Sequence, residues 1–165
     1  MTTLQDLPLH RVTVNCSRGE AGRLALPGWA REIDLATLDD VLGWRDAKAP
    51  GRAVLLVPTD DGPAGVVLSA ASEHGVRSSA MCALCRTTHG AGGVALFAAT
   101  RRGAAGRRGD TVGTYVCADL ACARHVRVDR PTAALRPDPG LTVDERRRGL
   151  RERAREFLDA LGDRS

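Results

Sequence analysis

Aromatic side chains are scarce in this sequence of 165 residues: they make up 3% of it. A hydrophobic core must therefore be built mainly from leucine, valine and alanine. Lysine is almost absent, since Lys48 is the single lysine of the chain. No apolar run approaches the ~20 residues that a membrane-spanning helix needs, and the N-terminus lacks the basic start and apolar stretch of a secretory signal. We therefore expect a soluble, cytoplasmic protein.

Cysteine occurs five times, and this odd number argues against a closed disulfide framework. In a reducing cytoplasm, closely spaced cysteines are metal ligands more often than disulfides. Cys82 and Cys85 have two residues between them, which lets both sulfurs turn toward one point and form half of a tetrahedral zinc site. Cys117 and Cys122 form the second pair. The fifth, Cys16, is expected to be buried as a small hydrophobic side chain.

The second pair has four residues between its cysteines, which leaves two other ligands open. His89 or His125 could take the place of a cysteine. We favour coordination by all four cysteines, because structural zinc sites are typically closed sets of thiolates. A catalytic zinc would need an open coordination position, and the His-x-Glu signature of the zinc deaminases is missing. Nothing resembles a P-loop, a nucleophile elbow or a paired-carboxylate site, so we expect no enzyme.

The local patterns predict an α+β protein in three parts. Residues 1–75 form an N-terminal α/β segment with a β-hairpin, since two β-rich runs at 53–57 and 65–68 flank an Asp-Gly turn. Residues 76–130 form a treble-clef zinc-finger module: a cysteine knuckle, a second hairpin turning at an Arg/Gly loop, and a helix that Asp119 can cap. We expect the loss of a zinc ligand to unfold this module and to spare the first half.

Residues 131–165 are predicted to be a linker followed by an amphipathic helix. Thr142 and Glu145 have the spacing of a capping box, which satisfies free amides at the start of a helix. The apolar side chains that follow fall on one helical face: Leu150, Ala154, Phe157, Leu158 and Leu161. Such a face suits packing against the body of the protein.

The basic residues are concentrated around the second hairpin. Between positions 101 and 127, six arginines stand against two aspartates, a surplus of +4 that equals the net charge of the chain. We expect these arginines to form one partner-binding face beside the metal site, where they could pair with carboxylates of a protein or with phosphates: Arg101, Arg102, Arg107, Arg108, Arg124 and Arg127. An RNA- or ribosome-binding zinc finger is the alternative, although Phe97 and Tyr115 are the only aromatics in this region for base stacking.

The second half of the chain also resembles a known family. The pattern is carried by CALCRTTH at 82–89, VALF at 94–97, AAGR at 104–107 and GDTVGTYVCADLAC at 109–122. These motifs are similar to the treble-clef domain of the elongation factor G-binding proteins, which are the FusB-type fusidic acid resistance proteins and their actinobacterial FBP-domain relatives. Stretches 14–21 and 42–46 resemble the short actinobacterial members.

The resemblance implies a function as well as a fold. Zinc would be held by Cys82, Cys85, Cys117 and Cys122, and the zinc finger would bind elongation factor G. Such binding can promote release of the factor from a ribosome stalled by fusidic acid.

Overall fold

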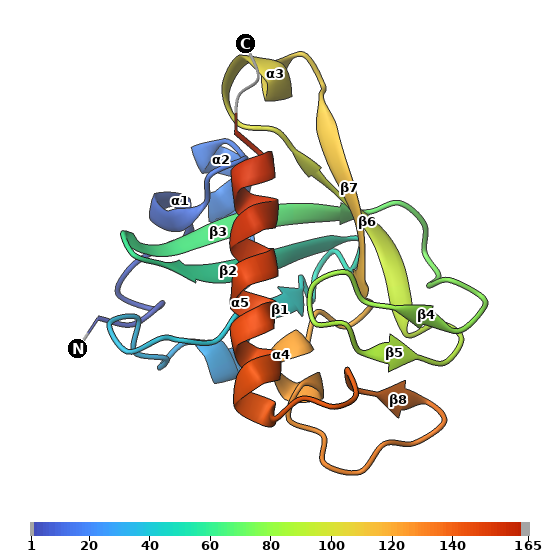
Figure 1. Ribbon diagram of the computed structural model, residues 1–165. Coiled ribbons are helices and arrows are strands. Elements are labelled where there is room, and N and C mark those ends of the chain that lie inside the picture. Colours follow the sequence, from blue (N-terminus) through green and yellow to red (C-terminus); the bar gives the residue numbers. More distant parts are fainter. Residues whose placement is uncertain (1, 163–165) are drawn as a thin grey trace.

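An antiparallel sheet forms the centre of the molecule (Figure 1). The computed structural model describes residues 2–162. The strands lie in the order β1-β2-β3-β6-β7, with the bounds Leu42–Arg45, Arg52–Thr59, Gly62–Ala70, Val94–Thr100 and Thr111–Cys117. Two hairpins supply most of the pairing. The β2–β3 hairpin turns at Gly62, whose φ of 105° suits glycine, and it confirms the Asp-Gly hairpin expected from the sequence.

Both faces of the sheet are covered, at least over β1 to β3. Strand β2 is buried on both sides, which explains its continuous apolar run from Ala53 to Val57. On one face, Leu55, Phe97 and their neighbours pack under the C-terminal helix α5 (Val143–Ala160) in a core that also holds the four paired cysteines. On the other face, Val54 packs with N-terminal residues in a second core.

Short elements surround the sheet. The N-terminal segment contributes α1 (Leu9–Val12), α2 (Arg18–Gly22) and the 3-10 turn η1 (Gly28–Ala30). A second, small sheet pairs β4, β5 and β8, with the bounds Ala80–Met81, Thr88–His89 and Leu135–Arg136. The tip of the β6–β7 hairpin holds α3 (Gly103–Arg107), and α4 (Cys122–His125) follows β7. Figure 1 places α3 and α4 near opposite ends of α5.

The long C-terminal helix begins as the sequence predicts. The Thr142 side chain accepts a hydrogen bond from the Glu145 amide, and the Glu145 carboxylate accepts one from the Thr142 amide. Leu150, Ala154 and Phe157 are buried against the sheet. The fold class expected from the sequence, α+β with two hairpins and a C-terminal helix, is confirmed. Within residues 2–162, none of the helices combines the length and apolar character needed to cross a membrane.

Several details differ from the sequence-based expectations. The Arg/Gly loop at the tip of the second hairpin contains the helix α3. The helix that Asp119 was expected to cap is limited to Cys122–His125, and its N-cap residue is Ala121, without a side-chain cap. Pairing of Ser69 with Ala98 joins β3 to β6, so one sheet crosses the boundary expected near residue 75.

Candidate metal centre

The first cysteine pair forms a tight knuckle after β4. The amides of Leu84 and Cys85 each donate to Cys82 Sγ at 3.4 Å. Arg86 has a φ of 58°, which turns the chain back so that the Cys82 amide can donate to the Thr87 carbonyl at 2.9 Å. This local geometry points both sulfurs toward one place, as the two-residue spacing predicts.

The second pair comes from two elements that meet at the same place. Cys117 is the last residue of β7, and Cys122 is the first residue of α4. Between them, Leu120 adopts a φ of 58°, and Asp119 Oδ1 accepts a hydrogen bond from the Ala121 amide at 2.9 Å. The four-residue spacing is therefore a sharp turn that brings the end of a strand and the start of a helix together.

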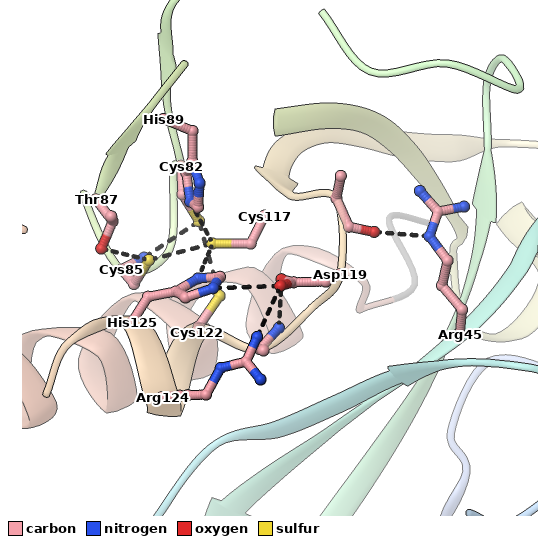
Figure 2. A network of polar contacts seen from close by, with 12 residues as sticks. Arg45, Cys82, Cys85, Thr87, His89, Cys117, Asp119, Cys122, Arg124 and His125 are labelled. Carbon is pink, nitrogen blue, oxygen red and sulfur yellow. Dashed lines mark hydrogen bonds and ion pairs between the residues drawn. The ribbon is translucent and has the colours of Figure 1, made fainter. Parts of the chain in front are cut away.

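The four sulfurs form one buried cluster, shown in Figure 2. Cys82 Sγ lies 3.8 Å from Cys122 Sγ, and Cys85 Sγ lies 3.5 Å from Cys117 Sγ. A tetrahedral zinc ion with Zn–S bonds near 2.3 Å requires sulfurs about 3.8 Å apart. The residues present therefore fit a closed four-cysteine zinc site of the structural kind, made of a knuckle, a hairpin end and a helix start.

The ionisation of the thiols also favours a cation. Hydrogen bonds from Cys117, Cys122 and Cys85 hold the pKa of the Cys82 thiol well below its usual value. Contacts with Cys117, Cys82 and Cys85, together with burial, raise the pKa of Cys122 well above its usual value. A bound divalent cation would favour the ionised form of all four sulfurs.

Two histidines lie against the cluster, and with Cys117 they form a second group of possible metal ligands. His89 Nε2 and His125 Nδ1 are each 3.2 Å from Cys117 Sγ, and both side chains are buried. Their rings meet edge to face at 4.8 Å. Burial, and then the neighbouring His125, lower the pKa of His89. This places both histidines at hydrogen-bonding distance from one ligand sulfur, where such groups orient a metal ligand.

Asp119 completes this set of contacts. Its Oδ2 lies 3.2 Å from His125 Nε2 and 3.2 Å from Arg124 Nη2 (Figure 2). Burial opposes ionisation, but the hydrogen bonds from His125 and from the Ala121 amide lower the pKa of Asp119 to about 2. The sequence suggested only a helix cap here, because nothing in the local spacing links Asp119 to His125.

Strand β1 holds the loop between Cys117 and Cys122. The Arg45 side chain donates from Nε to the Ala118 carbonyl at 2.6 Å, and its guanidinium carbon lies 4.9 Å from the centre of the Phe97 ring. A Cβ at Gly43 would lie 2.6 Å from the Leu120 carbonyl oxygen, so only glycine allows this approach. Sequence reasoning noted both residues only as part of the stretch 42–46 and missed their contact with the loop, which lies more than 70 positions away.

The six arginines of the expected partner face do not lie together. Four of them form one group at the tip of the β6–β7 hairpin: Arg101, Arg102, Arg107 and Arg108. In this group, Arg101 donates to the Ala160 carbonyl at the end of α5. Arg124 and Arg127 belong to the α4 region, which contacts the start of α5 through Arg146. The two groups lie near opposite ends of α5, which has 18 residues. Each residue of an α-helix adds about 1.5 Å to its length.

The comparisons with known proteins agree with this geometry. Searches of the curated proteins and of the solved structures found no match. A family model described as the FBP C-terminal treble-clef zinc-finger matches residues 9–161. This span contains all four cysteines of the cluster and the helix that packs over them. The chain therefore belongs to the FBP C-terminal treble-clef zinc-finger family.

Proposed function

We propose that this protein is a zinc-binding protein of the cytoplasm that binds elongation factor G through the tip of its β6–β7 hairpin. The proposal assigns it binding rather than catalysis. One observation carries the choice of surface: among residues 2–162, no hydrogen-bond or ion-pair partner is found for the side-chain guanidinium groups of Arg102, Arg107 or Arg108. These three side chains are called the tip arginines below.

The other arginines of the expected face are engaged within the protein. Arg101 donates to the Ala160 carbonyl, Arg124 pairs with Asp119, and Arg127 pairs with Asp40 at 2.8 Å. An arginine that already has an internal acceptor gains less from a partner. The tip arginines keep their donors available, so they are the better candidates for carboxylates on another protein.

The tip also presents these arginines on an ordered backbone. The Arg108 amide donates to the Ala104 carbonyl, and the Asp110 amide donates to the Ala105 carbonyl, both within 3.1 Å. A Cβ at Gly106 would meet the Arg101 carbonyl, so the turn is closely packed. A preformed arrangement of this kind reduces the ordering cost of binding.

A titration of the zinc-loaded protein with elongation factor G from the same organism tests this proposal. The Arg107→Glu/Arg108→Glu variant should raise the dissociation constant at least about tenfold. The control is Arg77→Glu/Arg130→Glu, which makes the same charge change at two exposed positions outside the tip. Absence of binding at micromolar concentrations, or equal loss in both variants, would contradict a specific contact at the tip.

An RNA- or ribosome-binding role remains the alternative, and one side chain favours it. Tyr115 is 51% exposed on the outer face of β7, where a base could stack on it. Phe97 is fully buried and cannot serve this purpose. For RNA binding, the logarithm of the binding constant would fall steeply and linearly with the logarithm of the salt concentration. The affinity would also depend on Tyr115. Measuring the salt slope with ribosomal RNA, in the native protein and in Tyr115→Ala, separates the two functions.

A further inference from the structure

A groove of about 560 Å³ runs along the outer edge of β1. The strand forms one wall, and residues 119–121 with Ala123 and Arg124 form the other. Trp29 stands at the groove and is 57% exposed. Ala123 and Arg124 of α4 line the groove, whereas Arg107 belongs to α3. Figure 1 places α3 and α4 near opposite ends of α5.

The backbone of β1 is paired on one side. The Asp46 amide donates to the Arg52 carbonyl at 2.8 Å, which fixes the alternation of the β1–β2 ladder. By this alternation, the main-chain groups of Gly43 and Arg45 point away from β2. Across residues 2–162, no hydrogen bond is found to these main-chain groups. A strand edge with unpaired donors and acceptors is a template for another strand.

Two tryptophans lie at the same wall of the groove. Trp44 lines the groove and is 4% exposed, and within the described residues its Nε1 has no hydrogen-bond partner. Trp29 and Trp44 meet edge to face, with ring centres 5.8 Å apart. The exposed Trp29 ring therefore packs against the edge of the buried Trp44 ring, which positions it at the groove.

The side chains that line the groove favour an apolar occupant. Val41, Leu42 and Leu120 line the groove together with alanines. The charged side chains at its rim are already engaged, since Asp119 pairs with Arg124 and Arg45 donates to the Ala118 and Pro50 carbonyls. An occupant with free charges would find no counter-charge there.

We propose that this groove binds an extended, apolar segment of a partner protein, which adds as a strand to the outer edge of β1 and places an apolar side chain between Trp29 and Leu120. This mode uses main-chain hydrogen bonds for affinity and a side-chain pocket for specificity. The inference does not rest on the binding of elongation factor G. Because one wall is the loop between two metal ligands, the groove depends on the zinc site.

Calorimetric titration with synthetic peptides tests the proposal. The probes are acetylated peptides of about nine residues in which threonine alternates with valine, with alanine, valine, leucine or phenylalanine at the centre. We expect saturable binding to the zinc-loaded protein that strengthens with the apolar size of the central residue. Methylation of alternate peptide amides should abolish binding, because it removes the N–H donors that would hydrogen-bond to the carbonyls of β1.

Variants at Trp29 locate the site. Trp29→Ala should weaken binding at least about tenfold, whereas Trp29→Phe should retain most of it. Both should fold, because the side chain is more than half exposed. Tyr115→Ala is the matched control, since it removes a similarly exposed aromatic from β7, outside the groove, and should leave peptide binding unchanged.

Three results would overturn the proposal. The first is no binding of any peptide at about 1 mM to folded, zinc-loaded protein. The second is equal binding of the methylated peptides, which would mean that main-chain hydrogen bonds to β1 do not contribute to binding. The third is concentration-dependent dimerisation that Trp29→Ala abolishes, which would make a second copy of this chain the occupant.

Discussion

At the scale of single residues, Gly43 controls how closely the sheet approaches the metal loop. Its missing side chain leaves room for Leu120, whose carbonyl oxygen would lie 2.6 Å from a Cβ at this position. Gly43→Ala should therefore destabilise the zinc-loaded protein by about 1–3 kcal/mol, the usual cost of overpacking. Chemical denaturation measures this change. Gly51→Ala is the control, because no atom lies within 4 Å of its added Cβ, and an equal loss in both variants would contradict the explanation.

The two buried histidines allow a second prediction at this scale. Both lie 3.2 Å from Cys117 Sγ, and His125 also contacts Asp119. If they orient the ligand, His125→Ala should lower zinc affinity by about 10–100-fold. The cobalt-substituted variant should keep the absorption of a four-sulfur site, since no ligand is lost. A changed spectrum would show instead that a histidine coordinates the metal.

Cys16 should be the single reactive thiol of the zinc-loaded protein. It lies outside the cluster and is half-buried, and burial raises its pKa above the usual value. The thiolate is the reacting form, so a raised pKa leaves less of it at pH 8 than in an unstructured peptide. Alkylation should modify one cysteine, slowly, with a rate that continues to rise above pH 9. Removal of zinc should expose four more thiols, and rapid modification of several before removal would contradict this.

At the scale of elements, α5 is held to the body by arginines as well as by its apolar face. Arg146 donates to the Val126 carbonyl at 2.8 Å, Arg155 donates to the Pro58 carbonyl at 2.9 Å, and Arg153 donates to the Leu84 carbonyl. Arg147 pairs with Asp40 at 3.2 Å. The helix thus bridges the sheet, the knuckle and the α4 region.

The apolar face of α5 gives a prediction about stability. Leu150 is 1% exposed and packs in the core that contains the cysteines. Leu150→Ala should cost about 2–5 kcal/mol, because it removes buried contacts and leaves a cavity. Arg148→Ala, an exposed change two residues earlier, should stay within about 0.5 kcal/mol of the native protein. Thermal and denaturant unfolding measure both, and similar values would contradict the packing of this face.

The elements that the sequence predicts are those defined by local signals. The β2–β3 hairpin, the β6–β7 hairpin and the capped helix α5 each carry a turn, an alternation or a cap within one stretch. The edge strand β1 and the two-residue strands of the small sheet were not predicted, because they are defined by distant partners. At the metal site, the cysteine spacing indicated the ligands, while the contacts of Arg45 and His125 depend on tertiary packing.

At the scale of the whole molecule, the zinc site belongs to the main core. The four cysteines are buried in one cluster with Val41, Leu55 and Phe97, which come from both sides of the expected boundary near residue 75. The second core, on the opposite face, shares strand β2 with the first through Val54 and also includes Trp44 of β1. The cysteine cluster, the sheet and the N-terminal segment are therefore joined by continuous packing.

This connection leads to a prediction about metal removal. The apparent binding free energy of structural zinc, about 10–16 kcal/mol, is comparable with the whole stability of a domain, about 5–15 kcal/mol. Because the sheet crosses from β3 to β6, a chelator should unfold the chain in one cooperative transition, rather than residues 80–128 alone. Trp29 and Trp44 lie outside those residues, so their near-ultraviolet circular dichroism should disappear together with the far-ultraviolet signal. Restoring zinc should recover both signals. Preserved tryptophan signals, with protected amides in β2 and β3 of the metal-free protein, would show instead that the first half folds independently.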